Sequence, residues 1–316
     1  MDITDRIRGL GVAVATPFFE GSSASGTGAV DLESFRRLVR HIRDGGADFL
    51  VALGSTGEAA TMSQDERDRL VAAAREERGE MPLVVGTGSN STETAIELAQ
   101  RASASGADAL LVVVPYYNKP QPAGIEAHFR AIAAAVPRLP IIVYNVPGRT
   151  GLNLAPHDLA RLWNIPQVVA VKESSGNLAQ IGEIARTLPS GKTLLSGDDA
   201  LALASIAVGA SGLVSVLANA LPAETKALVD AAMQGRMEEA RRLHYRLLPM
   251  MDALFMETNP APVKAAIQLL GISSAAVRLP LATASEATCA RLVEIFSSLG
   301  VQMRQVAGGQ LASRLS

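Results

Sequence analysis

The sequence predicts an α/β protein built on a (β/α)8 (TIM) barrel with a C-terminal helical region, and three observations carry this prediction. Eight short apolar runs alternate with amphipathic stretches across residues 1–222, as the strands and helices of such a barrel require. Runs such as LLVVV and VVAV are almost continuous leucine or β-branched residues, which is typical of parallel strands buried on both faces. With 48% hydrophobic and 4% aromatic residues, the 316-residue chain can build a large core from small side chains. A doubly wound open sheet is the alternative architecture.

The strands and helices of the predicted barrel follow from these patterns in order. The predicted strands are residues 11–16, 47–53, 83–87, 109–114, 141–144, 168–172, 193–196 and 212–216. Helical periodicity is clearest between them at residues 32–44, 64–77, 92–105 and 178–188. Two of these helices also have a start signal. Asp31 is a candidate N-cap, and Ser63 with Glu66 three residues later predicts a capping box.

The strand pattern stops after Leu221, and helical patterns follow at residues 223–232, 237–256, 262–270 and 285–299. We therefore predict a catalytic barrel domain over residues 1–222, a C-terminal helical region over residues 223–299, and a flexible tail over residues 300–316. A Gly/Ser-rich loop, EGSSASGTGA at residues 20–29, follows the first predicted strand. It could act as a lid on the barrel's active face or be a solvated insertion.

Charge and cysteine content exclude several classes of protein. A net charge of −2 gives no basic stripe for nucleic acid and no polybasic patch for a membrane surface. No apolar run approaches the roughly 20 residues of a membrane span. The single cysteine, Cys289, allows no disulfide framework and no CxxC pair, so we expect a reduced, cytoplasmic setting. Residues 1–10 carry acids and arginines rather than the apolar core of a secretory signal.

The motifs of metal and nucleotide sites are also missing. The four histidines share no metal-ligand spacing, so we expect no metal site: His41, His128, His157 and His244. There is no GxSxG nucleophile elbow and no Walker A loop. The segment GTGSNS at residues 86–91 begins like a dinucleotide-binding loop but lacks the third glycine.

Lys172 is the candidate catalytic residue. It is the only one of five lysines that ends a predicted buried strand, in the run QVVAVK. The carboxyl end of a barrel strand faces the active site, and partial desolvation there favours the neutral amine that attacks a carbonyl. From position alone, Lys172 could equally be a lysine whose stem lies at the strand end while its amine reaches solvent, or a partner of Glu173.

Other predicted strand ends carry residues suited to a small anionic carbonyl compound. The second strand ends in GSTGE (residues 54–58), where Ser55 and Thr56 could cradle a carboxylate with hydroxyls and turn amides. Later strand ends supply three tyrosines and an arginine: Tyr116, Tyr117, Tyr144 and Arg149. Each has an ordinary structural explanation, such as packing, a tight turn or a loop ion pair. Together they favour a site that binds a small keto acid.

These motifs resemble the dihydrodipicolinate synthase / N-acetylneuraminate lyase family. The matching segments occur in order from about residue 8 to residue 299: ATPF, GSTGEAATMS, GTGSN, PYYNKP, YNVPGRTG, VKESSGNL, LLSGDD, GLVSVLAN and NPAPVKAA. Within the family, PYYN, NVPGRTG and NPAPVK are closest to the synthase branch. That resemblance implies condensation of pyruvate with L-aspartate-4-semialdehyde to 4-hydroxy-tetrahydrodipicolinate in lysine and diaminopimelate biosynthesis. It implies no separate cofactor, because the imine between Lys172 and pyruvate is the electron sink.

The resemblance also implies a role for each matching residue. Lys172 would form the pyruvate imine, and Tyr144 would carry protons together with Ser55 and Tyr117. Tyr117 would reach in from a neighbouring subunit. The protein would then be a homotetramer built as a dimer of dimers. Thr56, together with Ser55, would bind the pyruvate carboxylate, and Arg149 would bind the semialdehyde carboxylate. Gly197 and Val214 would contribute backbone groups near the substrate.

Two departures from the family pattern matter, and the first leaves the substrate open. Ser55 stands where the synthases usually have threonine, and GSTGE is typical of the lyase branch, whereas Ala200 replaces the glutamate with which the lyase binds its sugar. Another pyruvate-dependent aldolase, acting on a 2-keto-3-deoxy sugar acid, 4-hydroxy-2-oxoglutarate or N-acetylneuraminate, is therefore a second hypothesis, and a barrel that only binds a small acid is a third.

The family's lysine-feedback site is matched at Asn90 and Tyr116 but not at four other positions: Ala59, Gln64, Arg67 and Thr94. We predict weak or absent inhibition by lysine.

Overall fold

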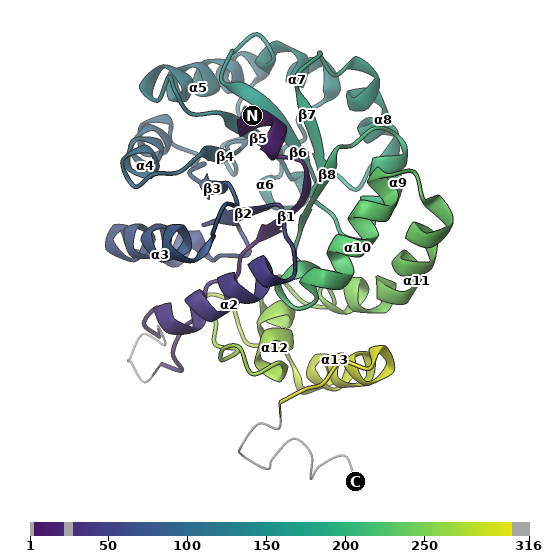
Figure 1. The fold of residues 1–316 in the computed structure, drawn as a ribbon. Coiled ribbons are helices and arrows are strands. Elements are labelled where there is room, and N and C mark those ends of the chain that lie inside the picture. Colours follow the sequence, from purple (N-terminus) through teal and green to yellow (C-terminus); the bar gives the residue numbers. More distant parts are fainter. Residues whose placement is uncertain (1–2, 22–27, 305–316) are drawn as a thin grey trace.

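The computed structural model describes residues 3–21 and 28–304, and its centre is a closed barrel of eight parallel strands (Figure 1). The strands are β1 (Gly9–Ala13), β2 (Phe49–Ala52), β3 (Leu83–Gly86), β4 (Ala109–Val113), β5 (Ile141–Asn145), β6 (Val168–Glu173), β7 (Thr193–Ser196) and β8 (Gly212–Ser215). Each strand pairs with the next in sequence, and β8 returns to pair with β1, which closes the sheet. The barrel prediction is confirmed, and the open doubly wound sheet is excluded.

Helices follow the strands and form the outer ring of the barrel (Figure 1). The ring consists of α2 (Leu32–Asp44), α3 (Gln64–Glu77), α4 (Thr92–Ala104), α5 (Pro122–Ala135), α7 (Pro156–Leu162), α8 (Leu178–Thr187), α9 (Ala202–Ala207) and α10 (Pro222–Met233). Short helical segments accompany them: α1 (Ile3–Arg6), η1 (Ala59–Thr61), α6 (Pro147–Thr150) and η2 (Leu217–Asn219). The predicted N-caps are confirmed. Asp31 accepts a hydrogen bond from the Ser34 amide at 3.0 Å, and both bonds of the Ser63–Glu66 capping box are present.

The barrel interior is filled by alternate residues of the strands, because successive side chains of a strand point to opposite faces. Phe49 is fully buried in this interior. Its ring occupies the space that a side chain at Gly11 would need, since a Cβ there would lie 2.2 Å from ring atoms. Ala170 belongs to the same interior cluster, so Lys172, two residues further along β6, also points into the barrel at its C-terminal end.

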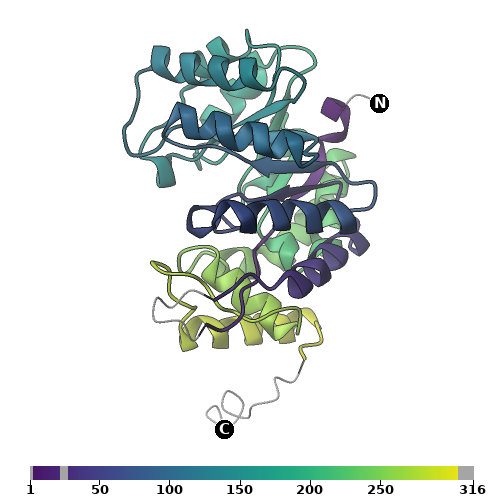
Figure 2. The ribbon, with the colours of Figure 1, turned by 90° about the vertical axis from the view of Figure 1, so that its left-hand side faces the viewer.

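The C-terminal helices continue from α10, which contacts both β1 and β8. They are α11 (Met237–Ala253), α12 (Ala261–Leu269) and α13 (Glu286–Leu299). Figures 1 and 2 place α12 and α13 together beside the barrel, with α13 on the outside. Seven successive residues of α12 are buried, because the barrel side and α13 cover it from opposite directions. No helix in the described part of the chain is both long and apolar enough to cross a membrane.

Two predicted segments fall partly outside the described residues. Of the loop at residues 20–29, residues 22–27 are not described, although its base is closed by a bridge between Phe18 and Val30 and by a 2.9 Å bond from the Phe19 amide to the Ala29 carbonyl. Of the tail predicted from residue 300, residues 305–316 are not described. The roles predicted for both segments, and the domain limits, stay predictions.

Candidate active site

Lys172 lies buried at the C-terminal end of β6, beside Tyr144 of β5. The two residues are register partners in the sheet, and the Lys172 Nζ lies 4.2 Å from the centroid of the Tyr144 ring. Only 5% of Lys172 is exposed, so its amine does not extend into solvent. Glu173 is not its partner. The Glu173 carboxylate accepts bonds from the Asn145 side-chain amide at 2.9 Å and from the Ser175 backbone amide at 2.7 Å. The Lys172 amine is therefore not committed to an ion pair with its sequence neighbour.

Gly197, the first residue after β7, leaves space for the Lys172 side chain. A Cβ at Gly197 would lie 2.7 Å from Lys172 Cε and 2.0 Å from Ser174 Oγ. Both distances are far below ordinary van der Waals contact. The family resemblance implied only backbone contact with substrate for Gly197. The structure adds that the absence of its side chain leaves room for the lysine.

The turn after β2 brings Ser55 and Thr56 to the same end of the barrel. Its backbone is held by bonds from the Gly57 amide to the Gly54 carbonyl at 3.1 Å and from the Glu58 amide to the Ser55 carbonyl at 3.2 Å. Thr56 is 2% exposed, and its hydroxyl oxygen accepts a bond from the Asn259 side-chain amide at 3.0 Å. The Thr56 hydroxyl proton is therefore still available to a ligand.

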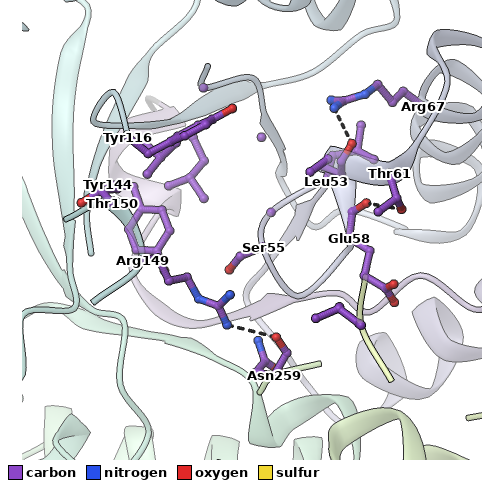
Figure 3. A pocket seen from close by; sticks show the side chains of 18 of the residues that line it. Leu53, Ser55, Glu58, Thr61, Arg67, Tyr116, Tyr144, Arg149, Thr150 and Asn259 are labelled. Carbon is purple, nitrogen blue, oxygen red and sulfur yellow. Dashed lines mark hydrogen bonds between the residues drawn. The ribbon is translucent and has the colours of Figure 1, made fainter. Parts of the chain in front are cut away.

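A cavity of about 360 Å³ opens above these residues (Figure 3). Its wall includes Ser55, Tyr144, Arg149, Asn259, Tyr116 and Arg67. Lys172 and Thr56 are not part of that wall but adjoin it through Tyr144 and Asn259. The cavity is of the size that small-molecule ligands occupy, and polar groups gather on a mostly apolar lining.

Arg149 projects into this cavity from α6. Its Nη2 donates to the Asn259 backbone carbonyl at 3.0 Å, and Figure 3 shows this bond beside Ser55. A guanidinium has five N–H donors, so one bond to a carbonyl orients Arg149 and leaves the others for a carboxylate. Buried Val214 lies in the barrel interior on β8, in the same cluster as Tyr144.

Tyr117 is not brought into the cavity of its own chain. It is 86% exposed, whereas its neighbour Tyr116 lines the cavity. Its backbone has φ +69°, a left-handed conformation that is unusual for a bulky residue and often marks a functional constraint. The sequence placed Tyr117 with the catalytic residues, and within one chain the structure does not bring it to them.

The sequence did not indicate a buried group of charges beside the cavity, in which Glu58 is itself part of the cavity wall. Lys264 of α12 and Glu58 form an ion pair of 2.6 Å in which neither side chain is more than 1% exposed. Glu58 also accepts a 3.0 Å bond from the Arg278 backbone amide. Two cations lie over the Phe18 ring, with Lys264 Nζ at 4.0 Å and Arg278 Cζ at 4.4 Å from its centroid. A lysine inside the apolar helical run APVKAAIQL was the signal that could have indicated a buried pair.

Burial lowers the pKa of Lys264 to about 8, and the nearby Glu58 carboxylate opposes this effect. A lowered lysine pKa is often a mark of a nucleophile. Here the pairing with Glu58 keeps Lys264 charged near neutral pH, and its side chain is fully buried away from the cavity wall. Lys264 is therefore a structural lysine, and Lys172 is the one that adjoins the cavity.

Among residues 3–21 and 28–304, no group of three or more histidine, cysteine or acidic side chains is arranged to hold a metal ion. His128 is buried, its Nδ1 lies 2.9 Å from the Thr92 hydroxyl, and burial lowers its pKa.

Fold and cavity together define a parallel (β/α)8-barrel protein with a small-molecule site at the C-terminal ends of its strands. Comparison with known proteins makes this more specific, because residues 6–299 match the model of the dihydrodipicolinate synthetase family. The chain belongs to that family, as the sequence motifs indicated.

Individual relatives cover nearly the whole chain. The 4-hydroxy-tetrahydrodipicolinate synthase of Geotalea uraniireducens is 46% identical over 291 residues, which are 92% of this chain and 98% of the relative. The 4-hydroxy-tetrahydrodipicolinate synthase of Thermomicrobium roseum is 46% identical over 293 residues, which are 92% of this chain and 94% of the relative. Among solved structures, dihydrodipicolinate synthase from Aquifex aeolicus has a TM-score of 0.89 at 38% identity, covering 95% of this chain and 100% of that one. A monomeric dihydrodipicolinate synthase variant has a TM-score of 0.90 at 39% identity, and the match covers 95% of this chain and 99% of that one.

Proposed function

We propose that this protein is a pyruvate-dependent lyase that condenses pyruvate with L-aspartate-4-semialdehyde to give 4-hydroxy-tetrahydrodipicolinate. The observation that carries the proposal is the buried amine of Lys172, which has no ion-pair partner among residues 3–21 and 28–304 and lies beside Tyr144, part of the wall of a cavity that Arg149 also lines. Relatives at 42–47% identity bear the name of this synthase. We infer that the protein acts in lysine and diaminopimelate biosynthesis.

Catalysis begins with pyruvate in this proposal. The neutral amine of Lys172 attacks the keto carbon and water leaves, which gives an imine. The pyruvate carboxylate is held by the Ser55 and Thr56 turn, whose hydroxyls can donate to it. The protonated imine withdraws electrons from the methyl group, which loses a proton and becomes the nucleophilic carbon of an enamine. Tyr144, 4.2 Å from the amine by its ring centroid, is placed to carry the protons of these steps.

The second substrate enters through the cavity. Arg149 binds its carboxylate with the donors that the Asn259 carbonyl leaves free, and the enamine carbon attacks its aldehyde. The amino group of this substrate then replaces Lys172 at the imine carbon. This step closes the ring of the product and returns the free lysine. No group besides the chain's own side chains is needed as an electron sink.

Tyr117 enters this scheme from a second subunit. Its 86% exposure and its constrained backbone support a role outside its own chain, so we infer a tight dimer in which each Tyr117 reaches the partner's site, within a homotetramer. Light scattering combined with assays at decreasing protein concentration tests this. A monomer with full activity would exclude the shared site, and the monomeric relative makes that outcome worth seeking.

Arg67 supports the prediction that lysine inhibits weakly or not at all. Arg67 lines the cavity near Tyr116, and its Nη2 donates to the Ala59 carbonyl. A fixed guanidinium there repels the ammonium groups of a lysine ligand. Activity measured with increasing lysine tests the prediction, and strong inhibition at low millimolar concentrations would contradict it.

Another pyruvate-dependent aldolase remains the second candidate because Ser55 gives the turn its lyase-like form. The imine chemistry at Lys172 would be unchanged, and only the aldehyde would differ. A coupled assay that offers aspartate semialdehyde beside sugar-acid substrates separates the two. Turnover of the semialdehyde with the higher kcat/KM supports the proposal, and turnover of only the sugar acids would replace it.

A further inference from the structure

A short turn at residues 278–281 forms one side of the cavity mouth. Pro280 and Leu281 line the cavity, while Leu279 at the tip is 62% exposed. The turn is closed by a 3.0 Å bond from the Leu281 amide to the Arg278 carbonyl. The position of the two lining residues therefore depends on where Arg278 is held.

The Arg278 side chain is fixed by acceptors for all five of its N–H groups. Its Nε and Nη2 donate to the Gly28 carbonyl at 3.0 and 2.8 Å, and its Nη1 donates to the Thr61 carbonyl and to Glu66 Oε2, both at 2.9 Å. The remaining donor of Nη2 reaches Glu66 Oε1, which makes the carboxylate pair bidentate. Arg278 is 5% exposed and lies against Phe18, so its head group is held within the protein.

Glu58 connects this anchor to the turn that carries Ser55. Its two carboxylate oxygens accept from Lys264 Nζ and from the Arg278 amide, and its own amide donates to the Ser55 carbonyl. Glu58 itself has φ +53°, a conformation that the surrounding contacts must maintain. One buried carboxylate thus holds together the turn that carries Ser55 and the turn that carries Leu281.

We propose that Arg278 is a positioning residue for the second substrate, which it serves by fixing Pro280 and Leu281 at the cavity mouth. This inference rests on the proposed function. Lys172 is 5% exposed and adjoins the cavity only through Tyr144, whereas Pro280 and Leu281 are part of the cavity wall itself. Displacing that wall changes the space around the incoming aldehyde and leaves the imine site in place.

Replacement Arg278→Met tests the inference, because methionine keeps an unbranched apolar stem over Phe18 and removes every bond of the guanidinium. We expect the KM for the semialdehyde to rise about tenfold or more, as misplacement of a binding wall does. The kcat and the KM for pyruvate should stay within about twofold, because loss of binding alone leaves kcat unchanged. Borohydride trapping of pyruvate on Lys172 should proceed at the unaltered rate.

Arg246→Met is the matched control. Arg246 also donates to a backbone carbonyl of the C-terminal helices, that of Leu299, but it is exposed and not part of the cavity wall. It should leave both KM values unchanged. Arg278→Lys, which retains the charge but not the fork geometry, should restore only part of the binding.

A failure of the proposed function and a failure of the role proposed for Arg278 give different results. Semialdehyde turnover by the unaltered protein tests the function, and the ratio of variant to unaltered KM tests the inference. An unchanged semialdehyde KM in Arg278→Met, or an equal rise in both KM values, would overturn the inference. If Arg278→Met does not fold, Leu281→Ala must give the same selective rise, because it alters the wall and leaves the anchor intact. Equal effects on the two substrates in that variant would overturn the inference as well.

Discussion

Replacing Gly197 with alanine tests whether the position of Lys172 governs catalysis. Gly197 does not have a positive φ, so alanine is compatible with its backbone and the expected effect is steric. The new Cβ would lie 2.7 Å from Lys172 Cε, where ordinary contacts begin at 3.4 Å. The lysine stem must therefore move by roughly 0.7 Å, and the Ser174 hydroxyl must rotate away from a position 2.0 Å from the new atom.

A displacement of this size matters because the amine must meet the keto carbon at a defined distance and angle. A misplacement of about 1 Å can reduce a rate about 10²-fold, so we expect a loss of that order in kcat/KM for Gly197→Ala. Pyruvate trapping with borohydride should slow by a similar factor, because imine formation is the step that depends on Lys172 directly. Circular dichroism and the oligomeric state should be unchanged.

Gly182→Ala is the matched control for this experiment. Gly182 lies on α8, and a Cβ there meets no atom within 4 Å. Alanine in a helix is better tolerated than glycine by about 0.5–1 kcal/mol, so this variant should be fully active and at least as stable. Normal trapping rates in Gly197→Ala would refute the argument that the empty Cβ position of Gly197 holds Lys172 in place.

Three further predictions concern Lys172 and the buried charges. Lys172→Ala should abolish most activity without lowering the thermal unfolding temperature appreciably, and normal turnover in that variant would contradict the mechanism. Lys264→Met leaves the Glu58 carboxylate buried without its cation, so the free energy of unfolding, measured in urea at fixed protein concentration, should fall by about 3–5 kcal/mol. The double variant Glu58→Gln, Lys264→Met should recover most of that loss, and equal losses in the single and double variants would show that the pairing is not the cause. The hydrogen bond from Arg278 lowers the pKa of Glu66 to about 2, so the stability from this group is present above pH 4.5 and lost as the pH falls toward 2. With a fifth of the Glu66 side chain exposed, we expect about 1–2 kcal/mol of acid-sensitive stability, and Glu66→Gln should flatten the pH dependence of unfolding in this range.

The barrel was predictable from the sequence because its signals are local. Continuous apolar runs identify strands buried on both faces, and caps such as Ser63 with Glu66 fix where helices begin. Consequently α2 and α3 have the predicted limits. The less regular helices α5, α7 and α9 were not singled out. They begin without a side-chain cap bond, and α9 is a six-residue apolar segment, ALASIA.

Strand limits were predicted less well where tertiary contacts end the sheet. The first strand was expected at residues 11–16, but β1 spans Gly9–Ala13. The apolar run continues past Ala13, yet the Asn219 side chain takes over the pairing there. It accepts from the Ala15 amide and donates to the Ala13 carbonyl, both at 2.9 Å. A bond between residues about two hundred positions apart leaves no local pattern in the sequence.

Contacts between distant residues leave no local pattern in the sequence, and this also explains which parts of the site were not predicted. Lys172 and Tyr144 lie at the ends of strands and Ser55 follows one, and the barrel topology alone brings strand ends together. The Glu58, Lys264 and Arg278 cluster joins three segments that the topology does not relate in any simple way. Their pairing depends on how α12 packs beside the barrel, which composition and periodicity do not specify.

Borohydride reduction detects an imine between Lys172 and pyruvate directly, because it converts the imine into a stable amine. The protein is incubated with pyruvate and borohydride, digested, and its peptides are mapped by mass spectrometry. We predict one pyruvate-derived adduct on the peptide that contains Lys172, and none on the peptide that contains the buried Lys264. An unmodified Lys172 under conditions of full activity would contradict it.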